Sequence, residues 1–339
     1  MTDKTLFYRI FNVPDAAYPV IDAIVSPLEQ RLICLLNKEQ FTVDDVERKL
    51  QEGCSRKGES VRDFTGRAYR RGIFSMVIPE TGEAAPNRFP RYTLSDFYGR
   101  LDVFVVTEPE RYSSFDPERR RALDEWYFNA YCARLNPDVS PTEDAVLPLA
   151  EVLDRIEQDP RQLYLSPCDC RSVAGNCEKP RLTCLSYRSG PNTFAGRGIA
   201  KPISHEEGKH IVIEADRIGL MHTAGPMAIC NCCGDCCYLF RAGKRRGSIP
   251  RWPLSRWLAT FTEERCVTCG KCVRRCHFGA LKRETTMEKK ANILLNQDRC
   301  AGCGICVSAC PSGALILRPR TEARRALRPE GVADDRLGI

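Results

Sequence analysis

The sequence lacks the motifs through which many redox enzymes and ATPases hold their nucleotide cofactors. It contains no GxGxxG turn and no phosphate-binding P-loop, the glycine-rich signatures of sites for dinucleotides and nucleoside triphosphates. It also lacks a run of about 18 to 20 apolar residues, which a membrane-spanning helix needs. Residues 1–30 show no continuous apolar segment of a secretion signal. We therefore expect a cytoplasmic protein with no membrane span and no obvious site for a two-electron cofactor.

Cysteine, in contrast, is abundant and unevenly placed. The chain has 20 cysteines, and 17 of them lie between Cys168 and Cys310. In a reducing cytosol, thiols clustered at short spacings bind metal more often than they form disulfides. Adjacent pairs such as Cys232 and Cys233 also have poor geometry for a disulfide. The C-terminal half is therefore predicted to be built around metal ligands.

Residues 1–110 carry the pattern of a winged-helix-like domain. Ser26 can form a capping box with Glu29, and similar caps start two further helices. Two strand-like segments follow, separated by a turn-rich stretch. We predict helices over 26–36, 42–50 and 60–71, and a hairpin formed by 73–78 and 91–94.

The last of these helices carries Arg67, Arg70 and Arg71, which could reach DNA phosphates. The helix dipole also favours arginines at a solvated helix end, and Asp63 lies on the same helix. A DNA-binding face is usually more distinctly basic. We therefore expect this domain to contact protein, and we do not expect DNA as its partner.

Residues 111–259 are predicted to form a helical, cysteine-rich middle domain. Apolar periodicity indicates helices over 116–136 and 146–158, and a capping box at Ser204 begins a third over 205–218. The predicted fold class is α+β, and residues 163–165 form a strand-like segment just before the first cysteines of this domain.

The strongest motif lies near the C-terminus. Residues 266–276 and 300–310 both follow the spacing C-x2-C-x2-C-x3-C. At an offset of 34, residues 266–281 and 300–315 share four cysteines, two glycines, a valine, an alanine and a leucine, which is nine of sixteen positions. Such an internal repeat of cysteine quartets is typical of iron–sulfur cluster binding. Structural zinc sites use C-x2-C pairs instead, so zinc is the weaker interpretation.

Residues 260–318 thus resemble the bacterial two-cluster [4Fe-4S] ferredoxin domain. One departure is His277, which stands where the family usually has a proline, and another is the longer segment 282–299 between the repeats. The resemblance implies that the fourth cysteine of each repeat crosses to the other cluster. The implied ligand sets are Cys266, Cys269, Cys272 and Cys310 for one cluster, and Cys300, Cys303, Cys306 and Cys276 for the other.

Nine more cysteines form a second constellation in the middle domain. One loop repeats the C-x2-C-x2-C spacing, with two further cysteines out of frame, so we predict at least one more [4Fe-4S] cluster there. Its fourth ligand could be the last cysteine of that loop or one of an upstream group. The upstream group could also hold a separate cluster or zinc, and some thiols could merely be buried. The loop has Cys230, Cys233 and Cys236 in frame with Cys232 and Cys237 outside it, and the upstream group is Cys168, Cys170, Cys177 and Cys184.

The net charge is uninformative once clusters are considered. The formal value of +7 counts every cysteine as neutral, whereas an oxidised cluster with four thiolates contributes about −2, so two clusters leave about +3. Residues 241–256 nevertheless contain six basic residues and no acidic one. We interpret this run as a docking face for an acidic redox partner or as compensation for cluster charge. A solvated basic loop is the alternative.

The C-x-C-R segment, the cysteine-doublet loop and the terminal repeat together resemble a group of larger ferredoxin-like proteins of anaerobic bacteria. This resemblance spans roughly residues 26–318 and implies electron transfer. We expect a non-catalytic subunit or donor that relays single electrons for an oxidoreductase complex. The alternatives are a DNA-binding redox sensor and an enzyme with catalysis at the middle cluster. Residues 319–339 are predicted to be a loose tail.

Overall fold

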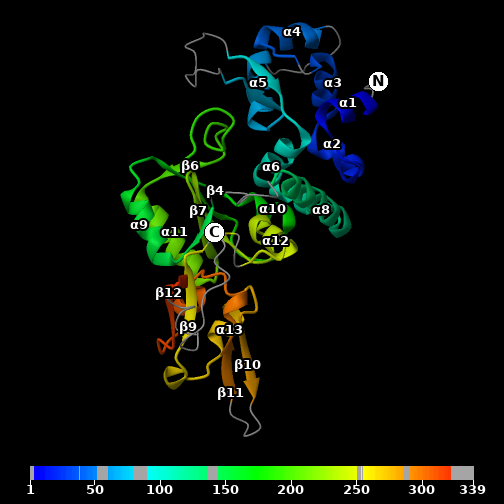
Figure 1. Cartoon of the computed structure of the whole chain (residues 1–339). Coiled ribbons are helices and arrows are strands. Elements are labelled where there is room, and N and C mark those ends of the chain that lie inside the picture. The colour runs from blue at the N-terminus through cyan, green and yellow to red at the C-terminus, as the bar shows by residue number, and fades with distance from the viewer. Residues whose placement is uncertain are drawn as a thin grey trace. The chain divides into compact units, whose positions relative to one another are not determined.

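The computed structural model describes residues 4–37, 39–51, 60–78, 90–135, 144–249, 253, 255–285 and 291–321 (Figure 1). The chain divides into two compact units. Among the described residues, no helix has both the length and the apolar character needed to cross a membrane. Unit 1 comprises Met1–Arg134 and Gln162–Ile203, and unit 2 comprises Leu135–Arg161 and Ser204–Ile339.

Unit 1 contains the three predicted helices and the predicted strand pair, preceded by three short helices that were not predicted. The helix from residue 27 starts at the capping box of Ser26 and Glu29, in which the Ser26 N–H donates to Glu29 Oε2 at 2.8 Å. The expected turn at 79–89 lies outside the described residues, and the winged-helix assignment stays a prediction. The elements are α1 (Lys4–Phe11), η1 (Asp15–Val20), α2 (Ile21–Ile24), α3 (Pro27–Leu36), α4 (Val43–Gln51), α5 (Val61–Arg70), and β1 (Phe74–Met76) antiparallel to β2 (Tyr92–Leu94).

A buried ionic network joins these helices to α6 (Phe97–Thr107). Arg100 is fully buried and donates to the Ile24 carbonyl at 2.7 Å and to Glu108 Oε1 at 2.8 Å. Arg71 donates to Glu108 Oε1 at 2.6 Å and to Glu29 Oε1 at 2.9 Å. Burial lowers the pKa of Arg100 to about 10, so the guanidinium is still charged at neutral pH. Removing one member would leave a buried charge without compensation.

The rest of unit 1 places a small sheet beside helices. β4 pairs antiparallel with both β5 and β6, and α10 packs against α6 and α8. The strand-like segment 163–165 of the sequence is confirmed as part of β4. The further elements are α7 (Pro109–Ser113), α8 (Pro117–Ala133), β4 (Leu163–Pro167), α10 (Asp169–Ala174), β5 (Leu182–Ser186) and β6 (Lys201–Ile203).

Unit 2 combines three further strands with the C-terminal repeat. Among these strands, β7 pairs antiparallel with β3 and with β8. The two ends of the repeat meet where β9 pairs with β12, and Figure 1 shows β10 and β11 as a hairpin within it. The elements are β3 (Ala145–Leu147), α9 (Leu149–Gln158), α11 (His205–Arg217), β7 (Met221–Gly225), β8 (Ala228–Cys232), α12 (Tyr238–Arg245), β9 (Trp257–Phe261), η2 (Glu263–Arg265), α13 (Lys271–Arg275), β10 (Leu281–Thr285), β11 (Ala291–Leu295), η3 (Gln297–Arg299), α14 (Ile305–Ser308) and β12 (Leu315–Pro319).

The middle of the chain contains more strands than the helical domain that we predicted. Residues 145–232 contain β3 to β8 in addition to the predicted helices. The helix expected over 146–158 begins at Leu149, because Val146 and Leu147 pair with β7 instead. These strands are three to five residues long, too short for a clear alternating pattern.

A carboxyl group in unit 1 has a pKa that makes stability depend on pH. Asp102 on α6 accepts a hydrogen bond from the Tyr127 hydroxyl on α8 at 2.8 Å, and it also bonds Asp169 on α10. Burial raises the pKa of Asp102 from 3.8 to about 6, which outweighs these hydrogen bonds. The folded state therefore holds the proton more tightly than the unfolded chain does.

We predict that this carboxyl group lowers stability as pH rises from about 4 to about 6, with no further change above that range. Asp102→Asn keeps a neutral side chain and should increase the free energy of unfolding near pH 7.5 by about 2 kcal/mol. Urea unfolding followed by far-UV circular dichroism, near pH 5 and near pH 7.5, measures this. Glu125→Gln, an exposed change on α8, is the control. An equal effect of both substitutions would contradict the assignment.

Candidate metal centres

The cysteines of the terminal repeat lie around one hydrophobic core. Cys272, Cys300 and Cys306 are buried in it together with Leu281 and Leu315. Three more pack against it while partly buried, Cys303 is also buried, and Cys269 is exposed. Seven of the eight thiols of the two quartets are thus at least partly withdrawn from water. The partly buried three are Cys266, Cys276 and Cys310.

The pKa of a thiol is raised by other thiols close to it, so the pKa shifts of these cysteines indicate which of them are neighbours. Burial, together with nearby Cys300 and Cys276, raises the pKa of Cys303 to about 12. Burial also raises the pKa of Cys306, and Cys303, Cys300, Cys276 and Cys272 raise it as well. Cys276 from the first quartet therefore lies close to the loop of the second quartet.

The thiols of the first loop are also neighbours of one another. Burial raises the pKa of Cys272, and the neighbours that raise it further are Cys266 and Cys269. Burial raises the pKa of Cys310, but hydrogen bonds from Ser312 and from backbone N–H groups outweigh burial, so that this pKa is lowered. The surroundings of Cys310 therefore favour a thiolate, which is the form that binds metal.

The chemistry of this donor set fits iron–sulfur clusters. Four thiolates in a poorly hydrated core repel one another and need a multivalent cation between them. Thiolate sulfur is the ligand that iron–sulfur clusters use. Backbone N–H groups reach two of the sulfurs, from Thr268 to Cys266 and from Ala280 to Cys276, both at 3.3 Å. Such bonds raise the reduction potential of a cluster by stabilising its added negative charge.

A second group of thiols lies in unit 1, where β4 ends. Cys168 caps α10 and accepts the Arg171 backbone N–H at 3.4 Å. The ligand atoms of Cys168, Asp169 and Cys184 all lie within 4.8 Å of one another. Hydrogen bonds from Cys170 and Cys184, helped by the charge of Arg171, lower the pKa of Cys168 despite its burial. This group offers sulfur and carboxylate donors, so both zinc and iron are compatible with it.

Asp169 and Cys177 differ in this region from what the sequence predicted or left open. Asp169 was not predicted as a ligand, although its place between Cys168 and Cys170 was a signal for it. Cys177 is partly exposed in the loop that joins α10 to β5.

The doublet loop forms a third group, in unit 2. It runs from the end of β8 to the start of α12, and the Cys236 N–H donates to Cys233 Sγ at 3.3 Å. The Sγ atoms of Cys232 and Cys237 are 3.4 Å apart. Hydrogen bonds with Cys230 and Cys237, together with burial, raise the pKa of Cys232 well above its usual value.

The doublet loop packs directly against the terminal repeat. A Cβ atom on Gly234 would lie 2.6 Å from the Cβ of His277, so only glycine fits there. His277 Nε2 is also 2.9 Å from the carbonyl oxygen of Gly219. Sequence reasoning identified His277 as a departure from the ferredoxin pattern but did not predict this contact, which joins residues far apart in the chain.

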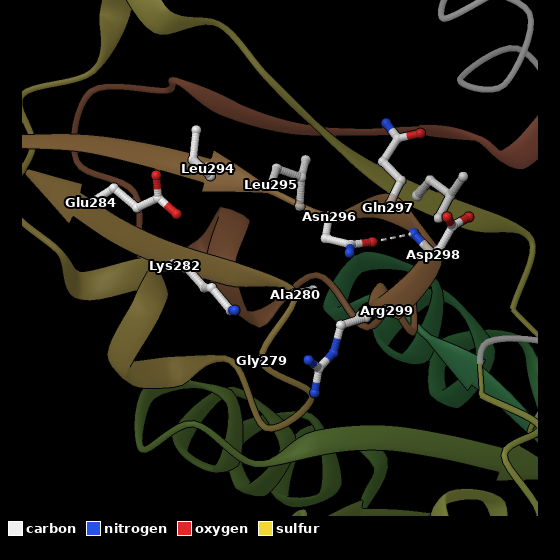
Figure 2. Close-up of a pocket in the computed structure, with 11 residues that line it drawn as sticks. Gly279, Ala280, Lys282, Glu284, Leu294, Leu295, Asn296, Gln297, Asp298 and Arg299 are labelled. Carbon is white, nitrogen blue, oxygen red and sulfur yellow. Dashed lines mark hydrogen bonds between the residues drawn. The ribbon is translucent and has the colours of Figure 1, made fainter. Parts of the chain in front are cut away.

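A surface groove lies beside the β10–β11 hairpin, with a volume of about 810 Å³ (Figure 2). Charges of both signs line it, and Asn296 Oδ1 accepts the Asp298 N–H at 2.9 Å. No cysteine is among the lining residues, so the groove is separate from the thiol groups. Its charged side chains are Lys282, Glu284, Asp298 and Arg299.

Residues 265–314 match the family model of the 4Fe-4S dicluster domain. No curated protein matches the chain. The terminal segment is therefore an iron–sulfur domain of ferredoxin type, as its cysteine spacing predicted. The larger architecture inferred for residues 26–318 and the ligands in the middle of the chain stay predictions.

The two cysteine loops of the terminal repeat carry different residues at one equivalent position, threonine in the first loop and glycine in the second. Exchanging these residues tests whether the backbone there favours glycine. Thr268 and Gly302 are equivalent at the offset of 34, and both have a positive φ, 50° and 68°. A β-branched residue is strained in this conformation by about 1 to 2 kcal/mol. At Gly302 a Cβ atom would lie 2.2 Å from the carbonyl oxygen of Trp257.

We predict that Thr268→Gly stabilises the protein by about 0.5 to 1 kcal/mol, because relief of strain exceeds the added chain entropy. Gly302→Thr should destabilise it by about 3 kcal/mol, through both strain and overlap with Trp257. Guanidinium unfolding of the anaerobic protein, followed by visible absorbance and circular dichroism, gives both values. Loss of stability in Thr268→Gly, or no loss in Gly302→Thr, would contradict the strain and the overlap assigned to these two positions.

Proposed function

We propose that this chain is an electron-transfer protein whose C-terminal domain relays single electrons through two [4Fe-4S] clusters. The observation that carries the proposal is the pair of cysteine quartets around one core, in a segment that matches a 4Fe-4S dicluster domain. The proposed ligands of one cluster are Cys266, Cys269, Cys272 and Cys310, and those of the other are Cys300, Cys303, Cys306 and Cys276. The position of Cys276 beside the second loop supports this crossed arrangement.

The first loop is the proposed point at which electrons enter or leave. Cys269 is exposed, and the neighbouring Val267 is 61% exposed. An exposed ligand beside an apolar side chain gives a partner both a short path to the cluster and a surface to pack against. The proposed partner is an oxidoreductase, to which this chain supplies or from which it takes one electron at a time.

The middle groups are proposed to extend this relay with one or two further clusters. Cys230, Cys233 and Cys236 offer one triplet in unit 2, and Cys168 with Cys184 offers a site in unit 1 that could instead hold zinc. The basic run 241–256 is proposed to balance cluster charge in part. Lys244 in this run donates to the Gly234 carbonyl at 2.8 Å, within the doublet loop.

The alternative of a DNA-binding sensor finds less support. Two of the three arginines considered for phosphate contacts already face a carboxylate of α3. Arg71 lies 2.9 Å and Arg67 lies 3.9 Å from Glu29 Oε1. Engaging DNA through Arg71 would break the buried network with Glu108.

Serine substitutions test the crossed assignment. Each fourth cysteine is compared with a loop cysteine that is proposed to bind the same cluster. The full chain should contain at least about eight irons and eight acid-labile sulfides. Cys310→Ser should lose the same electron paramagnetic resonance signal as Cys269→Ser, and Cys276→Ser the same signal as Cys303→Ser, with about four irons lost in each. Cys132→Ser on α8 is the control and should lose none. If Cys310→Ser matched Cys303→Ser instead, the crossed assignment would be wrong.

A further inference from the structure

Cys232 and Cys237 form a close pair that the cluster triplet of the doublet loop does not include. Their Sγ atoms are 3.4 Å apart, and each side chain is only 6% exposed. Cys232 is the last residue of β8, and Cys237 occupies the position just before the first residue of α12. Both thiols are thus fixed at the ends of regular elements and face each other inside unit 2.

This separation is short enough for a covalent bond to form with little rearrangement. A disulfide has an S–S distance of about 2.05 Å, so closure needs the two sulfurs to approach by little more than 1 Å. The two residues are five apart in the chain, which removes the obstacle that adjacent cysteines face. In reducing compartments the disulfides that do form are mostly transient and serve redox chemistry.

The pair also lies next to the terminal domain. Gly234, between the two cysteines in sequence, packs on His277, which directly follows Cys276. Phe240 on α12 stacks edge-on against Phe278, with ring centroids 5.4 Å apart. The doublet loop and α12, which hold Cys232 and Cys237, therefore contact the two residues that follow the proposed cluster ligand Cys276.

We propose that Cys232 and Cys237 are a dithiol–disulfide couple that exchanges electrons with the iron–sulfur domain. The inference rests on the proposed function, because it needs one-electron carriers nearby. On reduction the S–S bond breaks, the two sulfurs take up two electrons and two protons, and two thiols form. Two reduced iron–sulfur centres supply the electrons and solvent supplies the protons. The reverse reaction returns two electrons to two oxidised centres.

Such a couple would give the chain a two-electron site. Iron–sulfur clusters carry single electrons, whereas a disulfide is reduced by two. The substrate class that follows is a two-electron acceptor or donor of the thiol–disulfide kind, with a small molecule favoured because both thiols are buried.

Differential alkylation of the full chain tests the couple. Protein purified anaerobically is poised with dithionite or with ferricyanide, unfolded with a chelator, and labelled with iodoacetamide. It is then reduced, labelled with a second reagent and digested with trypsin. Fragment 218–241 holds five cysteines. We expect all five to carry the first label after dithionite, and two to carry the second label after ferricyanide, namely Cys232 and Cys237.

Two variants separate this inference from the proposed function. Cys232→Ser and Cys237→Ser should abolish the second label and leave the iron content unchanged, whereas Cys230→Ser should retain it. A second label on any other pair, or no second label after oxidation, would overturn the couple. So would the loss of about four irons from Cys237→Ser, because that residue would then be a cluster ligand. Absence of iron from the unaltered protein would instead contradict the proposed function.

Discussion

The C-terminal half of this protein depends on holding thiolates close together away from water. Burial and the neighbouring thiols together raise the pKa of Cys303 to about 12. Such groups cannot all ionise unless a strongly positive core lies between them. Cluster binding and folding of the terminal repeat should therefore be coupled, as they are in other metal sites whose ligands must lose protons to bind.

The terminal domain is also held by the remainder of unit 2. Arg275 donates to the Asp216 carbonyl oxygen at 3.1 Å, and Ser308 donates to the Asp216 carboxylate at 3.2 Å. The contact of Gly234 with His277 holds the doublet loop beside the residue that follows Cys276.

Local signals in the sequence predicted much of this structure. The capping boxes at Ser26 and Ser204 placed two helices correctly, and the repeated cysteine spacing identified the dicluster domain. The short strands β7 and β8 were missed, because each is held by pairing with distant segments rather than by its own pattern. The contact of Gly234 with His277 and the approach of Cys232 to Cys237 are likewise tertiary, so that sequence spacing alone could not predict them.

The central claim is that the two quartets hold two [4Fe-4S] clusters within one small core. Electron paramagnetic resonance during a potentiometric titration of the full chain tests it most directly. When half of the terminal iron is reduced, the spectrum should be that of isolated clusters. On full reduction it should broaden and split, because two spins lie within one domain. A full-reduction spectrum that was only the sum of independent signals, or a protein with zinc and no such signal, would contradict the account.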